Sequence, residues 1–326
     1  MQMQWMDGEN DLLLTCRETG DGIAVLRCET QDAVVHLPGF IGERPVTALG
    51  DYVLAERAPD LSGFSGLFTV RVGRGTDCAH DPCALHRLRV PESVRSVGNY
   101  AFYNCLDLEE LFLPKALTDV GSDAFLNCNR LHRVQIEASS DGTSCLRSVL
   151  REHHGELLCT LLFPDSTKAQ LWFPAYSEEY EELAAPHIFG YHIEGAGFTY
   201  RQCFDGGRLN FFQYDAALER LLRTQDFDSA VRVALCRLRW PRELLLANRE
   251  RYSALLAEHA ACALDMLLRE KNSEDMAYAL RLNLFPTGAL QRACDRARME
   301  RDTEMLGLLM ERLHRTGAVQ KRSFDL

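Results

Sequence analysis

The chain has 326 residues, of which 46% are hydrophobic, and a formal net charge of −11. A chain of this length and apolar content can bury the cores of two domains, which argues against disorder. Of the 47 acidic and 36 basic side chains, residues 1–200 carry 29 and 15, and this acidic excess argues against nucleic-acid binding by the first half.

The N-terminal segment favours a cytoplasmic location. It begins Met1-Gln-Met-Gln-Trp-Met-Asp7 and lacks the basic start and long apolar run of a secretory signal. The apolar stretches of the chain are too short to cross a bilayer, so no membrane association is expected. The twelve cysteines are then expected to be reduced thiols, mostly small residues of the core.

The first strand patterns lie between residues 35 and 72. Val35-His-Leu37-Pro38 and Leu67-Phe-Thr-Val70-Arg-Val72 both alternate apolar with other residues, which predicts short strands. The neighbours of the second strand, at 54–66 and 73–84, do not continue the pattern. A degraded copy of a repeating unit is therefore expected there.

A repeat with an offset of 23 residues begins at Leu85. One copy runs over 85–105, the next over 108–128, and a third begins at Leu131. Its Leu-x-x-Leu-x-Leu segment predicts a short strand with alternate side chains in a common core, and the proline that follows ends the strand because it has no N–H. Such a unit cannot bury its apolar face alone, so neighbouring units should stack into a solenoid.

Three positions in each copy have an expected local role. Gly98 and Gly121 are expected at a tight or positive-φ turn. The side chains of Asn104 and Asn127 are expected to cap backbone groups at a bend, and the cysteines that follow them, at 105 and 128, to stack in the core.

The pattern Leu-x-x-Leu-x-Leu-Pro…Val-Gly-x-x-Ala-Phe-x-Asn-Cys resembles the BspA-type leucine-rich repeat of bacterial proteins. Residues 35–52 resemble the usual first unit of that family, with five extra residues between Pro38 and Val46. About five units are visible, two of them regular. The resemblance implies a β-solenoid, but the family's usual export and role in adhesion are not carried over, because an export signal and a wall-anchoring tail are not found.

After Ile136 the repeat fades into three apolar segments at 146–150, 156–164 and 170–174. We expect them to be strands that close the solenoid, with Phe-Pro twice in the place of Leu-Pro. The repeat domain is therefore assigned to residues 1–176.

The period of the apolar pattern changes after this domain. Ser177 followed by four glutamates within five residues predicts the start of a helix, and a Gly-rich aromatic stretch completes a junction at 177–212. From 213 to 326, apolar residues recur every three or four positions, which predicts antiparallel helix pairs, and the last two pairs correspond with an offset of about 30. The expected fold class is α+β, a β-solenoid followed by an all-α, α-solenoid-like domain.

The outward positions of the repeat strands form the candidate binding surface for a protein or peptide partner. Phe112 is the one apolar residue in this polar row, and it is expected either to anchor a partner or to be covered by a neighbouring loop. The expected function is a non-catalytic interaction scaffold. The candidate residues are Arg87, Arg89, Glu110, Phe112, Arg133 and Gln135.

Two alternatives remain open. The first is a structural protein held together by zinc, for which imidazole and thiol groups are suitable ligands. The candidate ligands are Cys78, His80, Cys83 and His86, within nine residues. The second is an enzyme with a site at the junction, formed by the aromatic and His-bearing segment His187–Phe212.

Other polar clusters have simpler explanations. His153 and His154 are adjacent and fit a turn, and the glutamates at 178, 179, 181 and 182 fit a solvated helix start. No phosphate-binding loop, nucleophile elbow or dinucleotide fingerprint is found in the sequence. We therefore assign no catalytic residue and no cofactor.

Overall fold

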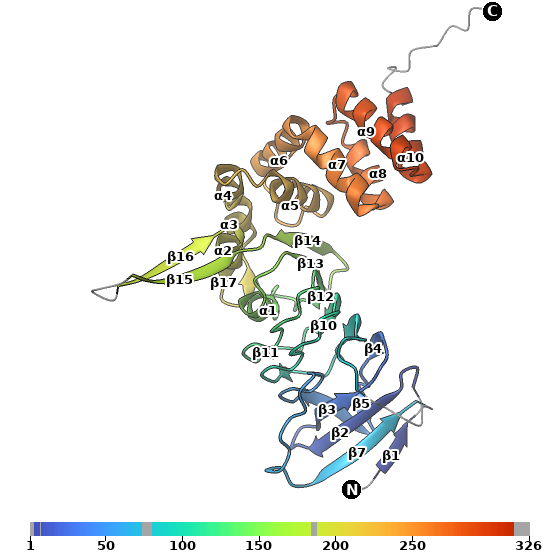
Figure 1. Ribbon diagram of the computed structural model, residues 1–326, viewed down its shortest axis with the longest axis vertical. Helices are drawn as coiled ribbons and strands as arrows, with labels where there is room; N and C mark the ends of the chain where they lie inside the picture. The colour runs from blue at the N-terminus through green and yellow to red at the C-terminus, as the bar shows by residue number, and fades with distance from the viewer. Residues whose placement is uncertain (1–2, 7, 74–79, 184–187, 316–326) are drawn as a thin grey trace, which may run out of the picture. The chain divides into compact units, whose positions relative to one another are not determined.

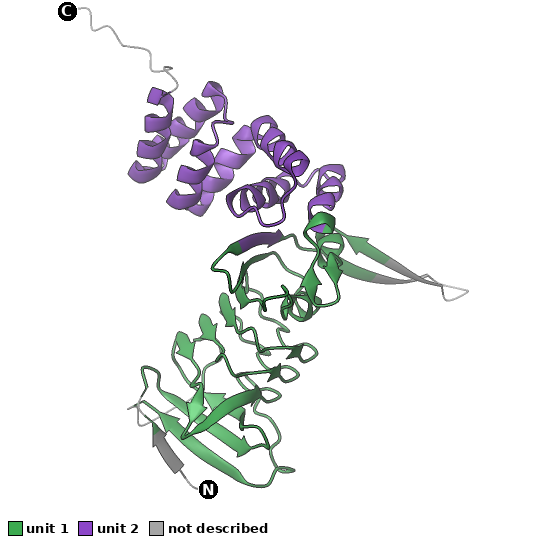
Figure 2. Cartoon of the chain, turned by 180° about the vertical axis from the view of Figure 1, so that it is seen from behind, with its two compact units in different colours: residues 1–168, 173–213 green, residues 169–172, 214–326 purple. Residues whose placement is uncertain are grey.

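The computed structural model describes residues 3–6, 8–73, 80–183 and 188–315. The chain divides into two compact units (Figure 2). Unit 1 contains residues 1–168 and 173–213, and unit 2 contains residues 169–172 and 214–326. Unit 1 is built mainly from strands and unit 2 mainly from helices, so the α+β class predicted from the sequence is confirmed.

The repeat forms a sheet of parallel strands, one from each coil of a solenoid (Figure 1). Equivalent residues of successive copies are paired, so that Leu88 lies beside Leu111 and Leu111 beside Val134. All three are buried, because alternation along each strand turns every second side chain into the core. In order, the strands are β13 (Leu157–Leu162), β12 (Arg133–Glu137), β10 (Glu110–Leu113), β8 (Arg87–Arg89) and β4 (Val34–His36). Strand β14 (Lys168–Phe173) completes the sheet beside β13.

On the other side of the coils, a second set of short strands is followed by glycines that lie against the neighbouring coil. The short strands β6 (Arg44–Leu49), β9 (Ser96–Val97) and β11 (Asp119–Val120) run parallel, and a glycine follows each one. A Cβ atom on Gly98 would lie 2.4 Å from the backbone nitrogen of Asp51, and one on Gly121 would lie 2.5 Å from that of Asn99. Neither glycine has a positive φ, so glycine is needed here because successive coils approach closely.

The core of the coils is formed by the other repeated residues. The rings of Phe102 and Phe125 stack with centroids 5.5 Å apart, and the buried Cys128 thiol donates to the carbonyl oxygen of Phe102.

The expected capping by asparagine is wrong, because the Asn127 side chain donates to the side chain of Asn104 at 2.7 Å. Both asparagines have φ near +60°, a conformation that asparagine tolerates better than most residues.

Residues 12–29 form a hairpin that the repeat pattern does not predict. Its strands are β2 (Leu12–Glu18) and β3 (Ile23–Glu29), and β3 pairs in parallel with β6. The strand predicted at Leu67–Val72 exists as β7, but it pairs antiparallel with β2 and in parallel with β1 (Met3–Met6). Its expected place as a degraded copy between two solenoid units is wrong, since β4 pairs directly with β8.

The five extra residues of the opening unit form a small hairpin. Strand β5 (Phe40–Ile41) pairs antiparallel with the start of β6, and Gly42 has a φ of +61° in the turn between them. This hairpin brings the exposed ring of Phe40 beside the end of the neighbouring coil.

Two elements after the repeat differ from the prediction. Residues 146–150 lie in helix α1 (Leu146–Glu152), because Leu146, Val149 and Leu150 are buried at the spacing of one helix face. Ser177 begins strand β15 (Ser177–Leu183), which pairs over its whole length with β16 (Ile188–Glu194). Here cross-strand pairing overrides the helical preference of the glutamates. Unit 1 ends with α2 (Gly197–Arg201) and the β17 (Phe204–Asp205) and β18 (Arg208–Leu209) hairpin.

Unit 2 is a stack of helices, as predicted. It also contains residues 169–172, which belong to β14 (Lys168–Phe173). Helix α5 packs on α6 and α7, α7 packs on α9, and α8 packs on α10. Within the described part of the chain, no helix has the length and apolar character needed to cross a bilayer. The helices are α3 (Phe211–Ala216), α4 (Leu218–Arg223), α5 (Phe227–Arg239), α6 (Leu246–Glu258), α7 (Ala260–Glu270), α8 (Ser273–Arg281), α9 (Thr287–Met299) and α10 (Thr303–Arg315).

The offset of 30 residues in unit 2 has a structural basis. Lys271, with a φ of +52°, follows α7, and the side chain of Asn272 then caps α8. Arg301, with a φ of +58°, follows α9, and the carboxylate of Asp302 accepts from the backbone N–H of Met305 at the start of α10. The same left-handed turn and N-cap therefore join both helix pairs.

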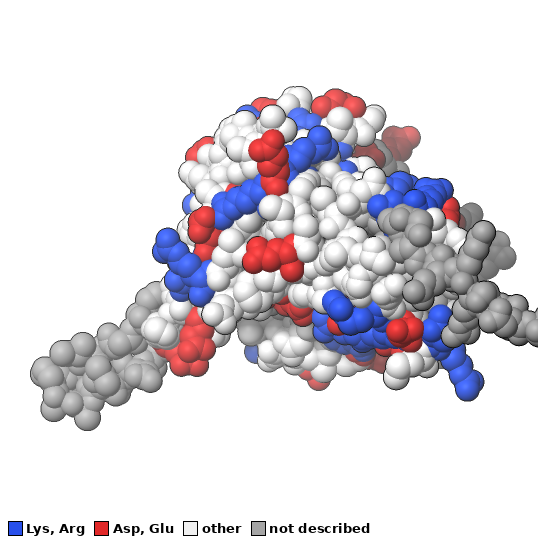
Figure 3. Space-filling model, turned by 90° about the horizontal axis from the view of Figure 1, so that it is seen from above, with Lys and Arg blue, Asp and Glu red and all other residues white. Residues whose placement is uncertain are grey.

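Several arginines of unit 2 form ion pairs between helices. Arg269 pairs with Asp228 at 3.0 Å, and Arg296 with Asp265 at 3.1 Å. On the face shown in Figure 3, acidic and basic side chains lie interspersed, so neither sign covers it continuously.

Candidate functional site

The outward face of the parallel sheet carries two rows of side chains that cross the strands. In the first row, Glu110 lies between Arg87 and Arg133, at 3.2 Å from the Nε atom of Arg87 and 2.6 Å from an Nη atom of Arg133. Three of the six predicted site residues are thus brought together in a charge network in which two arginines share one carboxylate.

The second row contains the other three predicted residues. The sheet register places Phe112 between Arg89 and Gln135. The Arg89 guanidinium lies 4.7 Å from the centroid of the Phe112 ring, an arrangement that favours the cation over the face of the ring. Phe112 is half-buried, and this guanidinium lies over its ring.

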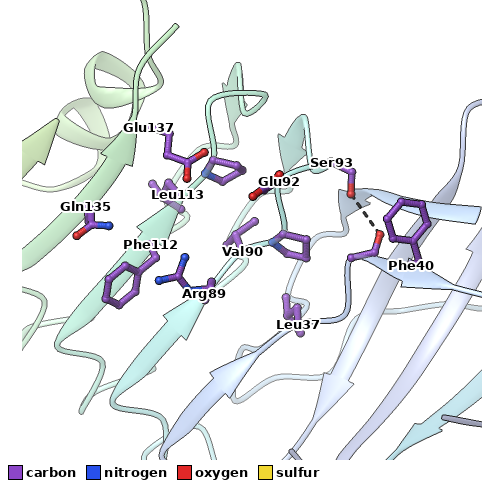
Figure 4. A pocket seen from close by; sticks show the side chains of 13 residues that line it. Leu37, Phe40, Arg89, Val90, Glu92, Ser93, Phe112, Leu113, Gln135 and Glu137 are labelled. Carbon is purple, nitrogen blue, oxygen red and sulfur yellow. Dashed lines mark hydrogen bonds between the residues drawn. The ribbon is translucent and has the colours of Figure 1, made fainter. Parts of the chain in front are cut away.

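A pocket of about 470 Å³ opens beside this second row (Figure 4). Its apolar floor includes the buried side chains of Leu37, Val90 and Leu113. The prolines that end β8 and β10, at 91 and 114, also line it, because the chain turns away from the sheet at each of them. The pocket therefore follows directly from the strand-ending Pro of the repeat.

The rim of the pocket carries charge and one exposed ring. Arg89 contributes one cation, while Glu92 and Glu137 contribute two carboxylates. Phe40 stands at the far side, with 58% of its surface exposed. The site thus offers apolar area surrounded by a net negative charge.

Sequence reasoning missed Phe40, Glu92 and Glu137 as site residues. Glu137 continues the outward alternation of β12 by one more step, which the spacing could have shown. Phe40 belongs to the five-residue insertion, and the repeat pattern does not show that this insertion lies next to the sheet. Glu92 lies after the strand, where alternation no longer applies.

The four candidate zinc ligands do not form a described cluster. Cys78 lies outside the described residues. The Nε2 atom of His80 lies 3.1 and 3.0 Å from the carbonyl oxygens of Leu54 and Ala55, and burial, together with Arg27, lowers the pKa of His80. His86 lies 3.7 Å from a carboxylate oxygen of Glu109, and Cys83 is half-buried. Among the residues described, no group of three or more metal-binding side chains is found.

The segment proposed for an enzyme site is only partly described. His187 lies outside the described residues, and Phe198 and Gln202 belong to the last part of unit 1. The four glutamates from 178 to 182 belong to β15, where the backbone is extended, so the predicted helix start is wrong.

His153 and His154 follow α1 and have different environments. His154 is exposed, and its ring lies 4.6 Å from that of Tyr176. His153 is buried, and burial, followed by the charge of Arg201, lowers its pKa from 6.5 to about 4. His153 is therefore neutral in the folded protein near neutral pH.

This difference predicts that unit 1 loses stability in mild acid. Below pH 6.5 the unfolded chain takes up a proton on His153, whereas the folded chain does so only near pH 4. The free energy of unfolding should therefore fall by about 2 kcal/mol from this residue between pH 7 and pH 5. Urea unfolding at both pH values should show a smaller fall for His153→Gln and an unchanged one for the exposed His36→Gln. Equal pH dependence in wild type and His153→Gln would refute the assignment.

Comparisons with known proteins agree with the repeat. Residues 76–148 match a family model described as a BspA type leucine rich repeat region of 6 copies. No curated protein matches the chain.

Two solved structures are similar to it. One is a leucine rich cell surface protein from Faecalibacterium prausnitzii A2-165, with 18% identity, a TM-score of 0.26, and coverage of 41% of this chain and 33% of that one. The other is a T. pallidum leucine rich repeat protein, with 20% identity, a TM-score of 0.22, and coverage of 46% and 80%. The chain thus spans a third of the length of the first. From the family match and the paired 23-residue coils, this chain carries a BspA-type leucine-rich-repeat region, followed by a helical unit.

Proposed function

We propose that the protein is a non-catalytic scaffold that binds a segment of a partner protein on the outward face of its parallel sheet. The observation that carries the proposal is the pocket beside Arg89, Phe112 and Gln135. Leucine-rich repeats present an extended surface of this kind, and an aromatic ring beside a guanidinium is a common centre of a protein interface.

The lining of the pocket specifies the chemistry of the partner. The exposed ring of Phe40 and the half-buried ring of Phe112 favour an aliphatic or aromatic side chain between them. The carboxylates of Glu92 and Glu137 favour a Lys or Arg nearby in the partner. The expected ligand is therefore an extended peptide with an apolar anchor and at least one basic residue.

A displayed library of random peptides tests this expectation. Peptides selected on the full chain should be enriched in an aliphatic or aromatic residue flanked by Lys or Arg, and they should not be retained by the Phe112→Ala variant. Phe64→Ala is a matched control, because Arg17 lies 4.8 Å from the Phe64 ring in a pair of the same kind that does not line the pocket. Peptides that depend equally on Phe64 and Phe112, or on neither, would contradict the proposal.

A further inference from the structure

A second cavity, of about 720 Å³, lies in unit 1 where the solenoid ends. Its walls come from α1, from the segment around Tyr176, and from α2 with the turn at Gly206. The volume is in the range of small-molecule sites. It shares no lining residue with the pocket of the sheet face.

The side chains that line this cavity are mainly basic, whereas the chain as a whole is acidic. Three arginines, Arg147, Arg151 and Arg201, line it, against the single carboxylate of Glu178. The whole chain, by contrast, has a net charge of −11. A concentration of cations in an acidic protein favours an anionic ligand at this place.

Arg201 is the buried one of these three arginines. It is 5% exposed, and its guanidinium donates to the carbonyl oxygens of His153, Gly155, Pro174 and Gly197. Among the residues that the structure describes, no carboxylate pairs with it. These four carbonyl groups hold the guanidinium in place but do not neutralise it, because they carry no net charge.

The burial of Arg201 also affects its pKa. Burial lowers the pKa of Arg201 to about 10, against the opposite effect of Tyr176. A buried cation without a carboxylate is costly unless an anion lies nearby. The site therefore contains a positive charge that a bound anion would stabilise.

Arg147 and Arg151 supply two exposed cations to the cavity. Arg147 is exposed, and its one described bond is to the carbonyl oxygen of Gly206, at 3.2 Å. Arg151 pairs with Glu152 at 2.6 Å and also donates to the carbonyl oxygen of Val120. Both lie on α1, four residues apart, so both guanidinium groups come from the same side of the helix.

Part of the cavity wall is aromatic, and Arg201 lies 5.0 Å from the centroid of the Tyr176 ring. The ring of Tyr176 lies 4.6 Å from that of His154 and 5.6 Å from that of Phe198, and all three residues line the cavity. A ligand that reaches the arginines can place an apolar or planar group against these rings.

We propose that this cavity binds a small oxyanion, a phosphate or carboxylate group attached to an apolar or aromatic body. The charged group is held by Arg147 and Arg151 and stabilised by the buried charge of Arg201. Guanidinium groups fit both classes of oxyanion, because each offers two parallel N–H bonds. Glu178 limits the affinity by repulsion.

Calorimetric titration of the full chain tests the proposal with inorganic phosphate, adenosine monophosphate and citrate as probes. At least one should bind with one-to-one stoichiometry and a Kd below about 1 mM. Tighter binding of adenosine monophosphate than of inorganic phosphate indicates use of the aromatic wall, and tighter binding of citrate indicates a carboxylate ligand. The absence of saturable binding by all three overturns the proposal.

Variants locate the binding. Arg147→Ala and Arg151→Ala should each weaken it about tenfold, while Glu178→Gln should strengthen it. Arg95→Ala removes an exposed arginine of unit 1 outside the cavity and should change nothing. Phe112→Ala should also leave it unchanged, so the outcome is independent of the proposed function. Binding that is indifferent to both Arg147 and Arg151 overturns the proposal.

Discussion

Asp215→Ala is expected to lower the free energy of unfolding of unit 2 by about 3 to 5 kcal/mol, because it leaves a buried guanidinium without its partner. The carboxylate of Asp215 accepts from Arg237 at 2.6 and 3.0 Å, and both side chains are completely buried. Tyr252 donates to the same carboxylate at 2.8 Å, and Asn248 at 3.3 Å. One side chain thus ties α3 to α5 and α6.

Chemical denaturation followed by the helical circular-dichroism signal measures this effect. Asp295→Ala is the matched control, because Asp295 pairs with Arg298 at 2.8 Å while both side chains are mostly exposed. Its removal should cost less than about 0.5 kcal/mol. A loss of less than about 1 kcal/mol for Asp215→Ala would show that Arg237 finds other partners and that the buried pair does not hold unit 2 together.

Gly98→Ala is expected to destabilise unit 1 by about 3 kcal/mol, because the added methyl group must displace the backbone of the preceding coil. The new Cβ would lie 2.4 Å from the nitrogen of Asp51 and 2.5 Å from the carbonyl carbon of Gly50. Backbone atoms cannot move aside as the end of a flexible side chain can. The coil that contains Gly98 and the preceding coil would therefore move apart.

Gly20→Ala provides the comparison for this change. A Cβ on Gly20 meets nothing within 4 Å, so its free energy of unfolding should stay within about 0.5 kcal/mol of the wild-type value. Thermal or urea unfolding of the two variants measures the difference. A Gly98→Ala protein as stable as Gly20→Ala would mean that the coils are not stacked with glycine against backbone.

The solenoid could be predicted because each repeat of the sequence forms one coil of the structure. An offset of 23 residues brings Leu88, Leu111 and Val134 to equivalent points of successive coils, and the two-residue strand period decides which side chains face outward. The outward rows containing Arg87 and Arg89 follow from that alternation. No long-range information is needed beyond the repeat itself.

Elements outside the repeat depend on partners that the local sequence does not identify. The five residues from Leu146 suit a strand or a helix, and burial on one helix face decides for α1. Ser177 and the glutamates after it have a helical preference, which pairing with β16 overrides. Strand β7 keeps the spacing of a repeat strand, yet it pairs with β2, a strand that lies before the recognisable repeat.

The candidate site was predicted in part for the same reason. Alternation places Arg89, Phe112 and Gln135 on the outward face. The pocket beside them also needs the strand-ending prolines and the hairpin that carries Phe40, which come from different parts of the sequence. Their juxtaposition is a property of the folded chain.

Binding of a peptide segment by the sheet face around Phe112 is tested most directly by titrating one selected peptide against the wild type, Phe112→Ala and Phe64→Ala. The Kd should rise at least about tenfold for Phe112→Ala and stay within about twofold for Phe64→Ala. Equal affinity for the wild type and Phe112→Ala would contradict it.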